Sequence, residues 1–420
     1  MVLRKLVKNE YDVIVVGAGP AGSTTAERCA ENGLSVLLLE KRQEIGAPVR
    51  CGEGVSQKNM TDLGMKIPDH TWRQRIKGAY VYAPNGKEIK IRGDNTDGYI
   101  LERKAFDKWL AHNAAKKGAM VMTKSTVIDL ILEKTMDAAG DTITSVKGVK
   151  ASIGGDYFEI GSKVVVAADG VESMILRKAG IRSQKKLHLV DSAFQYLMCN
   201  VKNRDPEMIE IWLGEKITPR GYIWNFPKGH DSANVGIGVG GIWYGKTAKQ
   251  FLDEWIETQE WLEGGSVIET VCGCVPVGGL WKDMARNGIL GVGDAVNMVN
   301  PIHGGGIAES IFGGRIAGDI IAEAIKKGDI SKKGLQPYND RWWKERGENL
   351  SKIESVREMF EKLSDEEMNI LADILSGEDL EDLARGKNVV KLATLYTKFQ
   401  AKRAAHKISS AIGSYSEPIK

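Results

Sequence analysis

The sequence predicts a mixed α/β fold in which a nucleotide-binding domain and an antiparallel β-sheet domain share the chain discontinuously, followed by a helical C-terminal region. Three observations predict it. Within residues 12–40, a strand, a glycine-rich turn, a helix and a second strand follow one another. Residues 76–100 and 185–285 have the alternation and turn residues of antiparallel strands. Beyond residue 336 the chain is highly charged and has the pattern of helices.

The first unit has the order of a dinucleotide-binding βαβ motif. Residues 12–16 are a short β-branched run, followed by a turn with glycines at positions 17, 19 and 22, a helix, and a second apolar run that ends at Glu40. Gly17 allows a tight turn, Gly19 lets a pyrophosphate reach the backbone, and Gly22 lets helix and strand pack closely. Glu40 can accept ribose hydroxyls. A plain strand–helix turn is the alternative.

Further signals along the chain give the expected domain boundaries. A buried strand is predicted at 164–168, and a glycine-rich stretch at 288–306 precedes an amphipathic helix at 307–327. We expect a nucleotide-binding domain at 1–75, 101–184 and 286–335, an antiparallel substrate domain at 76–100 and 185–285, and a helical region at 336–420.

Composition narrows the class of protein. The chain has 420 residues with 58 Lys plus Arg against 55 Asp plus Glu, a balance that argues against nucleic-acid binding by the whole protein. The five cysteines form neither a disulfide framework nor a four-ligand metal site, so we expect a reduced cytoplasmic chain without metal. No run of about 18 uncharged apolar residues predicts a membrane span.

Two later stretches help to distinguish between the dinucleotides that such a unit can bind. Residues 169–177 (DGVESMILR) and 291–295 (GVGDA), the latter followed by Pro301, have the form and order found in FAD-dependent enzymes resembling p-hydroxybenzoate hydroxylase. Arg103 resembles an FAD-contacting arginine of those enzymes. Taken singly, Asp169 could be a turn residue and Asp294 a helix N-cap. The resemblance implies a Rossmann-like FAD-binding domain.

Two more stretches resemble the geranylgeranyl reductase family, and within it the archaeal reductases of digeranylgeranylglycerophospholipids. They are residues 46–56 (GAPVRCGEGVS) and 221–227 (GYIWNFP), and the resemblance runs from residue 11 to about 345. It implies an FAD-dependent reductase that hydrogenates the isoprenoid C=C bonds of digeranylgeranylglyceryl phospholipids to saturated, archaeol-type lipids. The prenylated phospholipid would be its substrate.

The resemblance also implies which residues contact FAD, and the glycine motif adds Gly17, Gly19 and Gly22 to that set. The assignment of Val127 as an FAD contact is based only on its position in a predicted strand. The predicted cofactor-binding residues are Gly17, Gly19, Ala21, Gly22, Glu40, Cys51, Gly52, Gly54, Arg103, Val127, Asp294, Gly306 and Ile307.

The aromatic residues of 222–226 alternate, so on a strand they share one face. A prenyl chain has no charge to bind, so its site must be an apolar tunnel closed by large rigid rings. A sheet core is the alternative interpretation of this pattern. Trp212 and Trp243 belong to the same domain and extend either the wall or the core. The predicted substrate-binding residues are Tyr222, Trp224, Phe226 and Pro227.

Reducing an isolated alkene needs a hydride and a proton. Cys51, a small polarizable residue near glycines, is the candidate catalytic residue against the flavin, with a buried small hydrophobe as the alternative. His303 is either a proton relay or a satisfied loop histidine. Without a second glycine-rich βαβ unit, NAD(P)H, ferredoxin or reduced deazaflavin are equally compatible electron donors.

Residues 385–416 contain no acidic residue and seven basic ones, with apolar residues at near-helical spacing. Such a segment predicts either a helix on an anionic membrane surface, placing the protein on the inner face of the membrane, or a solvated outer face packed on the enzyme. The basic residues are Arg385, Lys387, Lys391, Lys398, Lys402, Arg403 and Lys407, and the apolar ones are Leu392, Leu395, Phe399 and Ile408.

Two other functions share parts of this pattern. A flavin monooxygenase of an apolar substrate would have the same fold and FAD motifs, but the stretches at 46–56 and 221–227 argue against it. A non-catalytic prenyl-lipid carrier would have no need of Glu40 and Asp294 to hold FAD.

Overall fold

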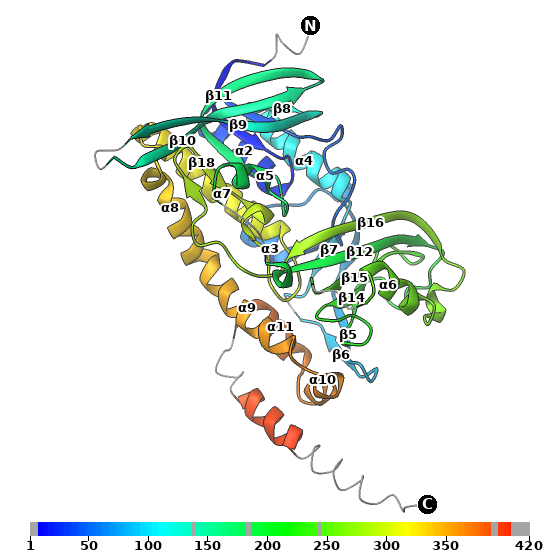
Figure 1. The fold of residues 1–420 in the computed structure, drawn as a ribbon. Coiled ribbons are helices and arrows are strands. Elements are labelled where there is room, and N and C mark those ends of the chain that lie inside the picture. Colours follow the sequence, from blue (N-terminus) through cyan, green and yellow to red (C-terminus); the bar gives the residue numbers. More distant parts are fainter. Residues whose placement is uncertain are drawn as a thin grey trace, which may run out of the picture.

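The computed structural model describes residues 7–404 apart from 94, 137–139, 182–185, 242–244 and 388–393. Two large sheets lie one beyond the other, and helices from the C-terminal part of the chain run alongside both (Figure 1). The predicted mixed α/β class with a helical C-terminal region is confirmed.

The upper sheet carries the glycine-rich turn. Its strands follow the order β17-β18-β11-β1-β2-β8, and β18, β11, β1, β2 and β8 run parallel. Residues 13–16 of β1 are buried, as expected for a parallel strand covered on both faces. β10 pairs antiparallel with β11, and β9 pairs antiparallel with β10. The strands are β1 (Glu10–Val16), β2 (Val36–Leu39), β8 (Met120–Met122), β9 (Ser125–Met136), β10 (Thr142–Ile153), β11 (Asp156–Ala167), β17 (Ala285–Arg286) and β18 (Ile289–Gly291).

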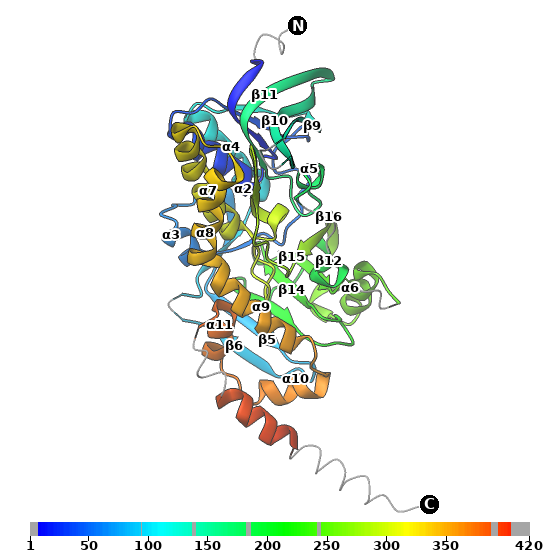
Figure 2. The same ribbon diagram turned by 60° about the vertical axis from the view of Figure 1, so that its left-hand side comes forward.

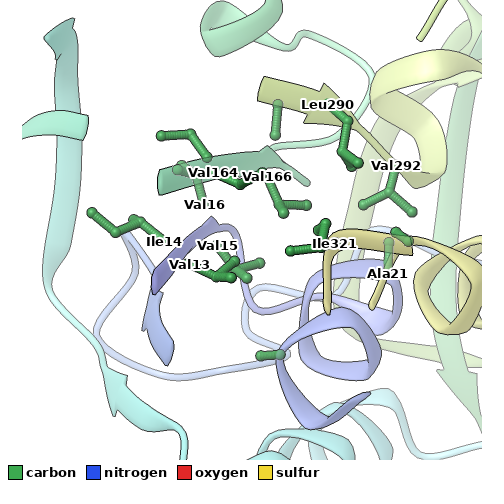
Figure 3. Close-up of a cluster of buried hydrophobic side chains, with 14 of the residues drawn as sticks. Val13, Ile14, Val15, Val16, Ala21, Val164, Val166, Leu290, Val292 and Ile321 are labelled. Carbon is green, nitrogen blue, oxygen red and sulfur yellow. The ribbon is translucent and has the colours of Figure 1, made fainter. Parts of the chain in front are cut away.

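Helices α2 (Pro20–Glu31), α4 (Arg103–Lys116) and α7 (Ile307–Lys327) lie on one side of this sheet, opposite the β9–β11 layer (Figure 2). The predicted helix at 307–327 is confirmed, and it ends because Gly328 adopts a left-handed conformation. Aliphatic side chains of β1, β11 and β18 meet Ile321 of α7 in the core (Figure 3). The short helices α3 (Gln57–Asp62) and α5 (Met174–Lys178) lie between these elements in sequence.

The lower sheet has the strand order β16-β12-β15-β14-β13-β5-β6 and is antiparallel except between β13 and β5. Helix α6 (Ala248–Ile256) covers one of its faces, where its Leu252 belongs to the same buried cluster as Ile223 and Ile237. The opposite face of the lower sheet is not covered by α6 and can contact other segments of the chain. The strands are β5 (Gly78–Tyr82), β6 (Glu88–Ile91), β12 (Val190–Cys199), β13 (Met208–Trp212), β14 (Tyr222–Pro227), β15 (Ser232–Val239) and β16 (Ser266–Pro276).

A three-stranded sheet of order β3-β7-β4 joins the two parts of the chain. It consists of β3 (Gly54–Ser56), β4 (Trp72–Ile76) and β7 (Gly98–Leu101). The antiparallel hairpin expected in this region is confirmed, because β5 pairs with β6 around the turn at 84–86.

Beyond residue 331 the chain is helical. Helices α8 and α9 are joined by a π-helical turn at Trp343–Gly347 and pass from the upper sheet to the lower one (Figure 1). Among the described residues, none of the helices has the length and apolar character needed to cross a bilayer. The helices are α8 (Lys332–Trp342), α9 (Glu348–Phe360), α10 (Asp365–Ala372) and α11 (Gly377–Arg385).

Candidate active site

The turn between β1 and α2 contains two sterically required glycines and one that faces open space. Gly17 has φ +104°, and a Cβ there would lie 2.4 Å from the carbonyl oxygen of Ala168. A Cβ on Gly22 would lie 1.9 Å from the carbonyl oxygen of Gly17. A Cβ on Gly19 would meet no atom within 4 Å. Gly19 is the N-cap of α2, so this open space lies where a helix N-terminus can receive a phosphate.

Glu40 directly follows β2 and is held by backbone N–H groups. Its Oε2 accepts a hydrogen bond from Ala18 N (3.0 Å), and its Oε1 accepts one from Arg42 N (2.9 Å). A cavity of ≈ 130 Å³ opens beside it. The residues that line this cavity are Ala18, Gly19, Glu40, Arg42, Gly46, Pro48, Val49, Arg50, Arg103 and Asp107.

The 291–295 stretch and the start of α7 meet the first turn. A Cβ on Gly293 would lie 2.8 Å from the Cβ of Ala21, and one on Gly306 would lie 3.1 Å from Asp294 Oδ1. Burial raises the pKa of Asp294 to about 6, although the charge of Arg103 opposes the rise. The fold thus brings Ala21, Asp294 and Gly306 together, with Ile307 next as the first residue of α7.

Two predicted positions have local structural roles. Asp169 accepts hydrogen bonds from Ser173 Oγ (2.6 Å) and Ile175 N (3.0 Å), so it stabilises the start of α5. Val127 lies on β9, two residues after Ser125, whose N–H donates to the carbonyl oxygen of Glu40 (2.9 Å). The FAD contact of Val127 stays a prediction.

Residues 51–54, which follow β2 in the chain and are called the Cys51–Gly54 segment below, pack against the aromatic strand β14. A Cβ on Gly52 would lie 3.0 Å from Phe226 Cε2, and one on Gly54 would lie 3.3 Å from the same atom. The N–H of Glu53 donates to Cys51 Sγ (3.2 Å), which fixes the thiol within this segment. Glycine at positions 52 and 54 therefore lets the backbone lie against the Phe226 ring, which a Cβ at either position would push away by a few tenths of an ångström.

Arg103 lies beside the Cys51 thiol. Its Nε and Nη2 donate to the two carboxylate oxygens of Asp107 at 2.8 Å each. Burial acts to lower the pKa of Arg103, but Asp107 and the Cys51 thiol outweigh it and raise that pKa well above the usual value. A fixed positive charge thus lies near both Asp294 and Cys51.

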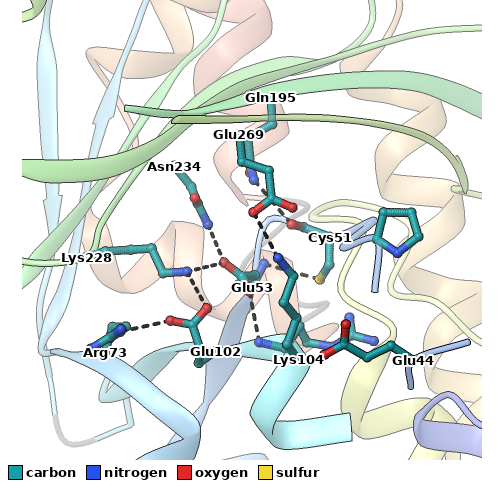
Figure 4. Close-up of polar contacts among 12 residues, drawn as sticks. Glu44, Cys51, Glu53, Arg73, Glu102, Lys104, Gln195, Lys228, Asn234 and Glu269 are labelled. Carbon is teal, nitrogen blue, oxygen red and sulfur yellow. Dashed lines mark hydrogen bonds and ion pairs between the residues drawn. The ribbon is translucent and has the colours of Figure 1, made fainter. Parts of the chain in front are cut away.

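A buried ion pair that the sequence did not indicate holds this segment to the lower sheet (Figure 4). Glu53 Oε2 accepts hydrogen bonds from Lys228 Nζ (2.6 Å) and Asn234 Nδ2 (2.8 Å), while its Oε1 accepts one from Arg103 N (2.9 Å). The side chains of Lys228 and Glu53 are only 6% and 3% exposed. Glu53 also has φ +76°, a left-handed conformation that is uncommon for a residue with a side chain.

The aromatic residues of β14 share the face that is turned away from α6. Ring centroids are 5.8 Å apart for Tyr222–Trp224 and 6.0 Å apart for Trp224–Phe226. The Trp224 ring lies over Gly236, where a Cβ would come within 2.3 Å of it. Its Nε1 donates to Gln195 Oε1 (2.9 Å), so the indole is fixed in place. These rings and the Cys51–Gly54 segment form the candidate substrate site.

The other aromatic candidates and His303 have different surroundings. Pro227 ends β14 and is buried, while Trp212 stacks with Tyr82 (centroids 5.1 Å apart) and packs against the α6 cluster. Trp212 is therefore on the core side and not in the aromatic wall, and Trp243 lies outside the described residues. His303 Nδ1 accepts from Gly305 N (3.1 Å), as a satisfied loop histidine does. Burial of the ring lowers its pKa to about 4, although the residue keeps solvent exposure.

Part of the basic C-terminal segment packs on the protein. Phe399 is buried, Arg403 pairs with Glu367 (2.5 Å) and Lys402 lies 3.9 Å from Asp373. Residues 388–393 and 405–420, with Lys391, Leu392, Lys407 and Ile408, lie outside the described residues.

Sequence comparison agrees with this geometry. Residues 190–275 match the model of the geranylgeranyl reductase catalytic domain, and residues 10–224 match that of an FAD-binding domain. Digeranylgeranylglycerophospholipid reductase from Methanocella arvoryzae is 42% identical over 92% of this chain and 97% of its own length. The chain belongs to the digeranylgeranylglycerophospholipid reductase family. It is an FAD-dependent reductase, as the resemblance implied, and not the monooxygenase or carrier considered above.

Structural comparison gives the same result. A geranylgeranyl bacteriochlorophyll reductase-like protein from Thermoplasma acidophilum superposes with a TM-score of 0.83, is 36% identical, and matches 92% of this chain and 99% of its own. The flavin-dependent brominase Bmp2, at 20% identity and TM-score 0.68 over 95% of this chain and 99% of its own, shares the fold alone.

The residues present fit FAD. The open space at Gly19 admits a pyrophosphate that a side chain would block, and Glu40 is positioned for ribose hydroxyls. Arg103 adds positive charge to the lining of the adjacent cavity. The family resemblance thus agrees with the local geometry, while the individual contacts stay predictions.

Proposed function

We propose that this reductase hydrogenates the isoprenoid C=C bonds of 2,3-di-O-geranylgeranylglyceryl phospholipids and yields saturated, archaeol-type chains. The observation that supports it best is the apposition of the β14 aromatic face and the Cys51–Gly54 segment. Rigid rings, glycines without side chains and a fixed Arg103 together suit a long apolar chain lying against a flavin.

Bound FAD, once reduced, supplies a hydride. In this proposal the residues of the chain bind and orient the alkene and exclude water. Trp224 and Phe226 close the apolar side of the site, and Gly52 and Gly54 allow the segment to pack against the Phe226 ring. Cys51 is proposed to contact the flavin, held by Arg103 and by the N–H of Glu53. Unchanged turnover and flavin spectrum in Cys51→Ala would remove Cys51 from the mechanism.

The electron donor and the location belong to the same proposal. We infer an external donor that binds transiently: NAD(P)H, ferredoxin or a reduced deazaflavin. We also infer that the enzyme acts at the inner face of the membrane, with the basic segment 385–416 against anionic lipid. A phospholipid could then enter the site chain-first while its headgroup stays at the surface.

Anaerobic photoreduction of the holoenzyme tests the reaction without choosing a donor. Digeranylgeranylglyceryl phosphate is added after reduction, and the lipid is followed by mass spectrometry. The proposal predicts successive gains of two hydrogens per double bond. Reduced flavin that is not reoxidised by the lipid, with no gain in lipid mass, would contradict it.

A further inference from the structure

A carboxyl group with one buried oxygen lies on the same sheet face as the aromatic wall. Ala193 of β12, Gly238 of β15 and Tyr222 of β14 are register partners across the sheet, so their side positions share one face. Asp191 precedes Ala193 by two residues and lies on that face too. The face that bears Tyr222, Trp224 and Phe226 therefore ends in an acid.

The surroundings of Asp191 are charged but leave one of its oxygens unsatisfied. Its Oδ1 is buried and has no hydrogen-bond partner among the described residues. The charges that act on it are those of Arg357 of α9, of Glu361 at the C-cap of that helix, and of Arg220 in the turn before β14. These three are engaged with one another: Arg220 Nη2 lies 2.6 Å from Glu361 Oε2, and Arg357 Nε lies 2.6 Å from Glu361 Oε1.

The Tyr222 hydroxyl belongs to a residue on the same sheet face as Asp191. It donates to the carbonyl oxygen of His303 (2.7 Å). A Cβ on Gly304 would lie 3.8 Å from that hydroxyl and 3.3 Å from Val275 Cγ1, and Val275 is the register partner of Asp191. The charges of Asp191 and Cys51 both act to raise the pKa of Tyr222, so both groups lie near its ring.

We propose that Asp191 is a positioning residue for the reaction, which holds a proton and passes it through the Tyr222 hydroxyl to the alkene carbon that does not receive the hydride. This inference rests on the proposed function. Tyr222 is the group that touches the substrate. Asp191 acts only through it.

The step balances as follows. The Tyr222 O–H bond breaks as a C–H bond forms on the alkene, and the phenolic oxygen regains a proton from the Asp191 carboxyl through a bridging water, because the two groups share no direct hydrogen bond. Asp191 is then reprotonated from water. No oxidant or reductant is needed beyond the hydride that the proposed function already supplies.

The electrostatics support a stored proton near neutral pH. Burial raises the pKa of Asp191 to about 7, with Glu361 adding to the rise while Arg357 and Arg220 oppose it. The acid form therefore predominates below this pKa and is lost above it. Burial is also the main cause that raises the pKa of Tyr222, which keeps its hydroxyl protonated.

The test compares Asp191→Asn with Asp231→Asn, an exposed carboxyl in the same domain. One pH unit below the Asp191 pKa, we expect Asp191→Asn to lower the single-turnover rate of saturation about a hundredfold while substrate binding is unchanged. The wild-type rate should fall about tenfold per pH unit above that pKa. That pH limb should be absent in Asp191→Asn, and Asp191→Glu should restore part of the rate.

A second readout does not depend on turnover. The infrared difference spectrum of the holoenzyme across the same pH range should contain a protonated-carboxyl band that Asp191→Asn lacks and Asp231→Asn keeps. An identical spectrum, or an unchanged rate and pH limb in Asp191→Asn, would overturn the inference while leaving the proposed function intact. A wild-type enzyme that forms no saturated product would overturn both.

Discussion

The glycines of the β1–α2 turn differ in what occupies the space that a side chain would fill. At Gly17 and Gly22 the neighbouring backbone fills it, and at Gly19 nothing in the protein does. The spacing of the motif predicted a separate role for each of the three glycines. It also predicted the acid at residue 40, but not that backbone N–H groups on both sides would fix its carboxylate.

Replacing these glycines should therefore have separable effects. Gly22→Ala forces a contact with backbone and should lower the free energy of unfolding of the apoprotein by about 1–3 kcal/mol. Gly19→Ala should leave the stability of the apoprotein unchanged but prevent FAD retention, because only the cofactor needs that space. Urea unfolding and flavin absorbance measure the two. Destabilised Gly19→Ala apoprotein would show that protein atoms occupy the position.

At the scale of elements, the alternation in β14 predicted that Tyr222, Trp224 and Phe226 share a face, but not which partner that face meets. The packing of α6 on Ile223 decides it, because that leaves the aromatic face to the Cys51–Gly54 segment. The Glu53–Lys228 pair joins residues 175 positions apart, and no local pattern predicts such a contact. The glycines on either side of Glu53 were the only available signal.

The Glu53–Lys228 pair should contribute strongly to holding the segment on the sheet. Lys228→Met leaves a buried carboxylate unpaired and should lower the free energy of unfolding by about 3–5 kcal/mol. The double variant with Glu53→Gln should recover part of the loss, since the uncompensated charge is gone. Lys58→Met is the matched control, because Lys58 pairs with Asp62 at the surface and should change stability by about 0–1 kcal/mol. A Lys228→Met loss no larger than the control would contradict this role.

At the scale of the whole molecule, the three FAD motifs come together from positions almost 300 residues apart, and the helical C-terminal region reaches the lower sheet through α9 (Figure 1). The order of the motifs predicted the first feature. The contact of α9 with the lower sheet was not predicted, because the charges of this helix do not indicate that Arg357 and the following Glu361 would lie largely buried against a sheet.

The basic segment allows a test of the proposed membrane location. Neutralising four of its lysines should abolish co-sedimentation with anionic vesicles, because each contributes about 1 kcal/mol near a charged surface. The same number of neutralised lysines in the β9–β11 layer, which carries the opposite end of the molecule in Figure 1, should leave it unchanged. A wild-type protein that does not bind the vesicles would end the proposal. The test lysines are Lys387, Lys391, Lys398 and Lys407, and the control lysines are Lys134, Lys147, Lys150 and Lys163.

The central claim is that a prenyl chain binds along the site that the β14 aromatic face and the Cys51–Gly54 segment form together. A digeranylgeranylglyceryl phosphate with a photoreactive group within one prenyl chain, bound to the holoenzyme and irradiated, measures this directly. Peptide mapping should find the label within 222–227 and 49–55, and unlabelled lipid should suppress it. Label concentrated on α6 or on the C-terminal helices would contradict the account.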